Sequence, residues 1–105
     1  MATQEEKNYM HAVARLGCIC CRNTLFKATP AQVHHKRKGI GKGQRASHFD
    51  TMPLCPDHHL YGSDAVHKNY TAFVARYGTE EALIEQTRRE VEQWRSQFVG
   101  NGGPL

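Results

Sequence analysis

Two pairs of residues with metal-binding side chains stand at close spacing in this chain. Cys18 and Cys21 are separated by two residues, and Cys55 and His58 repeat that spacing. Thiolate and imidazole groups in this pattern are typical of a zinc site with four ligands. The further histidines of the stretch from Cys18 to His59 include His34, His35 and His59. Because one tetrahedral zinc ion takes only four ligands, the surplus of histidines predicts a second site with different chemistry.

The four cysteines could alternatively form two disulfides. Cys20 and Cys21 are adjacent and no secretory signal is recognisable, so we expect a cytoplasmic protein whose thiolates bind metal. Cys20 is then expected to be a free thiol beside the zinc site, although the spacing leaves a Cys18/Cys20 pair open as the alternative. No apolar stretch approaches the roughly 18 residues that a membrane span requires, so no membrane partner is expected.

Length and charge narrow the class of protein. The 105 residues predict one domain over residues 1–105, and a chain this short gains stability from a metal staple. The net charge is +4, and residues 36–45 contain five cations and no anion. These cations are Lys36, Arg37, Lys38, Lys42 and Arg45. They favour contacts with a nucleic-acid backbone, although a solvated surface loop would have the same composition.

Three helices are predicted from apolar spacing and capping residues. The first covers residues 4–16 and begins with a capping box. The second begins at Ser63 or Asp64 and is stopped by Gly78, and the third covers about residues 79–98. We expect the apolar stripe of the third helix to join the core; a dimer contact is the alternative, so the oligomeric state stays open. This stripe consists of Leu83, Ile84, Thr87, Val91, Trp94 and Phe98.

Shorter elements are predicted between the first two helices. Residues 18–33 have no helical pattern and are expected to contain a turn and a strand. Three glycines predict a flexible loop over residues 38–46, and residues 48–54 are expected to be extended. Adjacent residues on a strand point to opposite faces, so His34 and His35 are suited to different functions. One can bind a metal while the other faces a reacting phosphate.

A strand pair with two histidines, an extended segment with Asp50 and a helix entered at His59 make up a ββα-metal layout. Residues 18–59 resemble the HNH endonucleases, also called the ββα-metal or His-Me finger superfamily. His35 precedes Asp50 by fifteen positions and Asp50 precedes His59 by nine, which are separations typical of that motif. More narrowly, residues 16–85 resemble the phage Ref-type family of RecA-dependent nucleases. The similar segments are GCICC, HHK, GKGQRASHFD, PLCPDHH, AVH and YGTEEAL.

This resemblance implies an α+β fold. A small zinc-stabilised ββα-metal (HNH) finger over residues 18–62 would be flanked by an N-terminal helix and two C-terminal helices over residues 64–98, with a tail over residues 99–105. The resemblance also implies a DNA endonuclease that is encoded by a phage or prophage and acts in recombination in the bacterial cytoplasm. DNA would be its partner, with RecA-coated DNA as a further possibility.

The resemblance implies a role for each candidate residue. The catalytic divalent metal, Mg²⁺ or Mn²⁺, would be bound by His34 and His59, and His35 would be the general base that activates water. The five cations of residues 36–45 would contact phosphates, which positions DNA without reading its sequence. The structural Zn²⁺ would be held by Cys18, Cys21, Cys55 and His58.

Two positions depart from the motif. Asp50 stands where asparagine is usual, and it could orient His35 through a hydrogen bond or become a metal ligand. Ser63 stands where a further ligand histidine is expected. His67 can replace that ligand if residues 61–64 loop out, and is otherwise a surface histidine.

Two other functions compete with a nuclease. A zinc-stabilised module could bind DNA or protein without cutting, but it has no use for the His34–His35 pair together with Asp50 and His59 at motif spacing. A zinc hydrolase of small molecules would give no function to the basic segment, residues 36–45. The histidine surplus therefore favours a nuclease.

Overall fold

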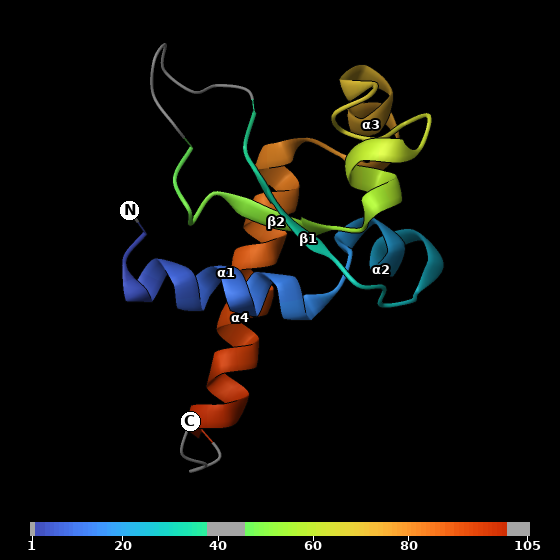
Figure 1. Ribbon diagram of the computed structural model, residues 1–105. Coiled ribbons are helices and arrows are strands. Elements are labelled where there is room, and N and C mark those ends of the chain that lie inside the picture. The colour runs from blue at the N-terminus through green and yellow to red at the C-terminus, as the bar shows by residue number, and fades with distance from the viewer. Residues whose placement is uncertain (1, 38–45, 101–105) are drawn as a thin grey trace.

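The computed structural model describes residues 2–37 and 46–100, and it has the small α+β architecture that the sequence predicts (Figure 1). A two-stranded antiparallel sheet is surrounded by helices. In chain order the elements are α1 (Gln4–Leu16), α2 (Ile19–Leu25), β1 (Gln32–His35), β2 (Thr51–Leu54), the π-helical turn η1 (Asp57–Tyr61), α3 (Tyr70–Tyr77) and α4 (Glu80–Gly100). Residues 38–45 of the predicted loop and residues 101–105 of the predicted tail lie outside the described residues. Residues 99 and 100, predicted to begin the tail, belong to α4 instead.

The capping box predicted for the first helix is confirmed. The Thr3 hydroxyl accepts a hydrogen bond from the Glu6 amide at 3.1 Å, and the Glu6 carboxylate accepts one from the Thr3 amide at 2.7 Å. Gly17 ends α1 with a φ of +83°, and a Cβ at this position would lie 3.2 Å from the Ala28 Cβ. Gly17 therefore turns the chain directly into the first cysteine pair.

The turn and strand predicted for residues 18–33 are wrong in their first part, where the chain forms α2. Ile19, Cys20 and Cys21 are all buried on this short helix, so no apolar period marks it in the sequence. The helix ends at Phe26, whose φ of +54° lies in the left-handed region. Extended structure begins only at β1.

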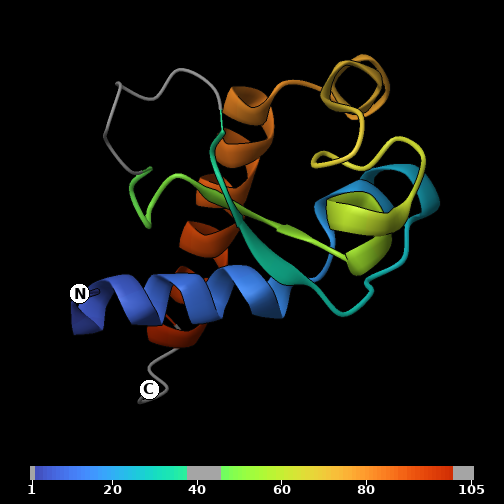
Figure 2. The same cartoon turned by 45° about the horizontal axis from the view of Figure 1, so that its top comes forward.

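The hairpin lies between two groups of helices. β1 pairs with β2 in a register that places His34 opposite Met52 and His35 opposite Thr51. α4 crosses behind the hairpin and α1 crosses α4, whereas α2, η1 and α3 gather at the far end of the strands (Figures 1 and 2). Buried side chains from α2, β2, α3 and α4 form the larger core cluster, and those of α1 pack with Val91 of α4 in a second cluster.

The second predicted helix begins later than expected. The turn η1 ends at Gly62, and α3 starts only at Tyr70, where the Asn69 side chain accepts a hydrogen bond from the Ala72 amide at 3.1 Å. The intervening segment folds back on η1, because the His67 amide donates to the His59 carbonyl at 3.1 Å. This loop replaces the first two turns of the predicted helix.

The last predicted helix is confirmed. Thr79 precedes it, and the Thr79 hydroxyl accepts a hydrogen bond from the Ala82 amide at 3.1 Å. Four residues of the predicted stripe are buried: Leu83, Ile84, Thr87 and Val91. The Phe98 side chain lies outside the described part of the chain. None of the helices formed by the described residues combines the length and the apolar character needed to cross a membrane.

Candidate metal centres

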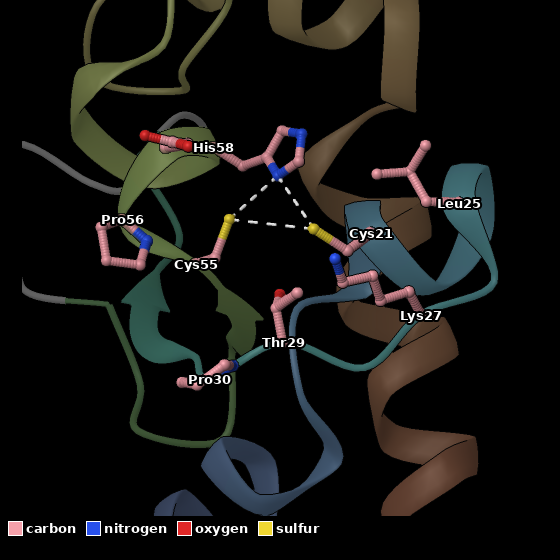
Figure 3. A pocket seen from close by; sticks show the side chains of 9 residues that line it. Cys21, Leu25, Lys27, Thr29, Pro30, Cys55, Pro56 and His58 are labelled. Carbon is pink, nitrogen blue, oxygen red and sulfur yellow. Dashed lines mark hydrogen bonds between the residues drawn. The ribbon is translucent and has the colours of Figure 1, made fainter.

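The four predicted zinc ligands converge where α2, β2 and η1 meet. Cys18 is the N-cap of α2, Cys21 lies on its first turn, Cys55 follows β2 and His58 lies on η1. One ligand atom of each lies within 4.8 Å of all the others. Figure 3 shows the side chains of Cys21, Cys55 and His58 pointing toward one another at the edge of a pocket.

The separations in this cluster fit a metal such as zinc. The sulfurs of Cys21 and Cys55 are 3.9 Å apart, and Nδ1 of His58 lies 3.5, 3.6 and 3.1 Å from the sulfurs of Cys18, Cys21 and Cys55. Zinc bonds of about 2.3 Å to sulfur and about 2.0 Å to nitrogen give a tetrahedron with edges of roughly 3.8 and 3.6 Å. Four protein ligands would leave no open position, as in structural rather than catalytic sites.

A tyrosine and an aspartate hold His58 from behind. Its Nε2 lies 3.1 Å from the Tyr77 hydroxyl, which donates to the Asp64 carboxylate at 3.0 Å. Burial raises the pKa of Tyr77 to about 12, so the phenol keeps its single proton at neutral pH. Because that proton goes to Asp64, the hydroxyl accepts from the Nε2–H of His58, and Nδ1 keeps a lone pair for a metal.

Cys20 is buried and stands outside the four-residue cluster, as predicted for the free thiol. A hydrogen bond between the Cys20 and Cys18 side chains, opposed by burial and aided by backbone hydrogen bonds, lowers the pKa of Cys18 to about 4. The same contact raises the pKa of Cys20 far above its ordinary value. Cys20 thus stabilises the thiolate form of its neighbour, which is the form that binds metal.

A second cluster contains three of the remaining histidines. One nitrogen of each of His34, His59 and His67 lies within 4.8 Å of the others, and their ring centroids are 4.7–5.2 Å apart. His34 comes from β1 and His59 from η1. His67 joins them because the segment after η1 folds back. From the sequence, His67 was expected to be a ligand only if a loop formed in this segment.

Hydrogen bonds decide which nitrogens of this cluster are open. Nε2 of His34 lies 2.8 Å from the Glu80 carboxylate, which leaves Nδ1 buried and without a partner among the described residues. Nδ1 of His59 lies 2.7 Å from the Gln32 side-chain oxygen, which leaves Nε2 open. Two rings are therefore tied to oxygen acceptors on one side and open on the other, as in histidine ligands of metals. The cluster fits a divalent cation.

Three histidines of this region, His35, His59 and His67, have lowered pKa values. Burial, reinforced by His34 and His67, lowers the pKa of His59 to about 4. Burial is also the main cause that lowers the pKa of His67 and of His35 below their ordinary values. Neutral imidazole is the form that binds a metal or accepts a proton, so these rings are suited to either task at pH 7.

His35 does not belong to the three-histidine cluster. Its Nε2 lies 2.9 Å from Nδ1 of His48, and the two rings line a pocket together with Lys36 and Ala46. This separation of His34 from His35 follows from the alternation of side chains along β1. The contact of His48 with His35 was not predicted.

Asp50 does not lie where its predicted role requires. Its carboxylate forms an ion pair with Arg88 of α4, and neither His35 nor the three-histidine cluster is among its contacts in the described residues. Asp50 lies just before β2, and it is its backbone carbonyl that faces the end of β1, where it accepts a hydrogen bond from the Lys36 amide at 3.0 Å. His48 instead provides the hydrogen bond to His35.

Two of the five predicted DNA-contacting cations lie in the described residues. Lys36 forms an ion pair of 3.3 Å with Glu81, and Arg37 donates to the Val66 carbonyl at 2.7 Å. Both side chains therefore contact other parts of the same chain. The other three, Lys38, Lys42 and Arg45, lie outside the described residues.

The residues that support the two clusters were not predicted as site residues. Glu80 follows a helix cap, where an acidic residue usually indicates only a favourable helix dipole. Tyr77 lies on α3 close to apolar residues such as Phe73 and Val74, a pattern that by itself indicates only a core position. Both act on histidines distant in the sequence, so no local signal marks them.

The fold and the two clusters define a small α+β protein with two groups of cysteine and histidine residues that could bind a metal. Residues 2–92 match the family described as "Recombination enhancement, RecA-dependent nuclease". Because this match covers most of the chain, the protein belongs to that family, and the predicted resemblance is confirmed at this level. No match was found among the curated proteins.

Proposed function

We propose that this protein is a metal-dependent DNA endonuclease of the HNH, or ββα-metal, type. The observation that carries the proposal is the three-histidine cluster, which is separate from the cysteine-rich cluster and adjacent in sequence to His35. A binding module needs only the structural site. The family description, which names a RecA-dependent nuclease, supports the same function.

In this proposal the histidine cluster holds the catalytic cation, Mg²⁺ or Mn²⁺, and the cysteine-rich cluster holds a structural Zn²⁺. The catalytic cation, when bound, polarises the scissile phosphate and offsets charge on the leaving oxygen. His34, His59 and His67 are its protein ligands. Because His59 is bonded to His58, the structural site fixes the backbone from which one catalytic ligand projects.

His35 is the general base of the proposed reaction. Its lowered pKa keeps the ring neutral at pH 7–8, so it can accept a proton from the water that attacks phosphorus. With Nε2 on His48, Nδ1 is the nitrogen available for that water. The contacts favour His48 over Asp50 as the residue that orients the base.

The basic segment binds the DNA backbone on either side of the cut. Lys36 and Arg37 stand directly after the strand that carries His35, so phosphates bound there lie near the reacting one. Contacts to phosphates give little sequence preference and a strong dependence on salt. RecA-coated DNA is the partner that the family description supports.

Cleavage of plasmid DNA tests the proposal. Purified protein is incubated with supercoiled plasmid and Mg²⁺ or Mn²⁺, with and without RecA filaments, and compared with His35→Ala. We expect cleavage by the parent and a loss of about 10²-fold or more in the variant. His11→Ala, at an exposed position of α1, is the matched control and should cleave like the parent. DNA binding without cleavage under every condition would instead support the zinc-stabilised binding module.

A further inference from the structure

Glu80 is a fully buried carboxylate that faces the histidine cluster. Its side chain is 0% exposed, and it is the first residue of α4. One carboxylate oxygen lies 2.8 Å from Nε2 of His34, whose side chain is 1% exposed. The Arg37 backbone amide donates to both oxygens at 3.0 Å, and the Tyr70 hydroxyl donates to one of them at 3.0 Å.

This set of donors joins four parts of the chain at a single carboxylate. His34 belongs to β1, the Arg37 amide to the segment after it, Tyr70 to the start of α3, and Glu80 to the start of α4. Burying a carboxylate is costly, and the cost is offset only when its oxygens receive several hydrogen bonds. The helix N-terminus favours the same negative charge. The site is therefore built for an anion at this position.

The orientation of the His34 ring indicates the role of the Glu80 carboxylate. With Nε2 held by Glu80, the other nitrogen, Nδ1, is buried without a partner among the described residues and lies with the nitrogens of His59 and His67. A side chain needed only for packing would not require a charged acceptor there. A carboxylate behind a histidine ligand fixes the ring and makes its open nitrogen a stronger donor.

We propose that Glu80 is a positioning residue for the cation of the histidine cluster, acting through His34. It holds the His34 ring so that Nδ1 faces His59 and His67, and its charge strengthens the binding of a divalent cation. The inference rests on the proposed function, because it requires that the cluster binds a cation. It adds a residue of α4 to a site whose other members all lie between β1 and His67.

Mn²⁺ binding to the zinc-loaded protein tests this inference without relying on cleavage. Bound Mn²⁺ is measured by electron paramagnetic resonance for the parent, Glu80→Gln and Glu81→Gln. We expect Glu80→Gln to weaken Mn²⁺ binding about 10–100-fold, while zinc stays at the parent's content. Glu81→Gln is the matched control, because Glu81 is the next residue on the same helix, is mostly exposed and pairs with Lys36. It should bind Mn²⁺ like the parent.

The outcomes separate the two proposals. Equal Mn²⁺ affinity of the folded Glu80→Gln protein and the parent overturns the positioning role and leaves the nuclease proposal standing. If the parent binds no Mn²⁺, or if His34→Ala binds Mn²⁺ as tightly as the parent, both proposals are overturned. If Glu80→Gln does not fold, Glu80→Asp replaces it, because the shorter carboxylate keeps the charge but reaches less far toward His34. Parent-like Mn²⁺ affinity in the folded Asp variant then overturns the inference.

Discussion

Replacing Tyr77 with phenylalanine is expected to weaken the binding of structural zinc while leaving the fold in place. The phenylalanine ring keeps the contacts of the tyrosine ring with Phe73 and His58, whose centroids lie 5.2 and 4.9 Å away. Only the hydroxyl is lost, and with it the hydrogen bonds to His58 and Asp64. The variant therefore tests the hydrogen bond between the Tyr77 hydroxyl and His58 without changing the packing of the ring.

The structure sets the size of this effect. Removing an outer partner of a metal ligand typically weakens metal binding about 10–100-fold, which is about 1.4–2.7 kcal/mol. His58 and Tyr77 are only partly buried, so water can replace part of the lost hydrogen bond. A neutral hydrogen bond contributes about 0.5–1.5 kcal/mol net. We therefore expect a Kd for zinc raised about tenfold, at the lower end of the range.

Competition with a coloured zinc chelator at neutral pH measures this change. Tyr61→Phe is the matched control, because the Tyr61 side chain is on the neighbouring turn η1 and Tyr61 is 69% exposed. Circular dichroism in excess zinc shows whether both variants fold. If Tyr77→Phe binds zinc as tightly as Tyr61→Phe, the hydroxyl does not hold His58 in the ligand geometry, and the assignment of Nδ1 as the metal-facing nitrogen loses its basis.

Further outcomes are expected from the core, the cysteines, the pH and the choice of metal. Phe73→Ala, at a 0% exposed position, should lower the free energy of unfolding by about 3–5 kcal/mol in urea titrations, whereas Leu25→Ala, at a 62% exposed position, should change it by less than about 0.5 kcal/mol. Metal analysis should show zinc lost from Cys55→Ser and retained in Cys20→Ala; the reverse pattern would place Cys20 among the ligands. The metal-free protein should lose stability as the pH falls from about 6.5 to about 4, because His59 is protonated in the unfolded chain at a higher pH than in the folded protein. A Tm that rises on acidification in this window would contradict the burial of the His59 ring. Mn²⁺ should support cleavage at a lower concentration than Mg²⁺, because imidazole ligands favour transition ions, and equal half-saturating concentrations would argue against three histidine ligands.

Several features of the protein follow from local sequence. The capping box of α1 and the buried stripe of α4 were predicted because each depends on neighbours within a few positions along the chain. The separation of His34 from His35 was predicted because adjacent residues on a strand alternate. The grouping of four cysteine and histidine residues followed from their spacing alone.

Other features depend on contacts between distant parts of the chain. The short helix α2, whose first three residues are all buried, has no helical period. The segment after η1 bends back through hydrogen bonds that no residue pattern predicts. That bend brings His67 to His59. Asp50 pairs with Arg88 of α4, and His35 contacts His48 instead.

The amino-acid sequence by itself determined which side chains can bind metal and that they divide into two groups. The tertiary structure alone decided how each group is supported. Glu80 lies 46 positions after His34 and Tyr77 lies 19 after His58. Their pairing depends on how α3 and α4 pack against the hairpin, and packing is a property of the whole chain that local spacing does not encode.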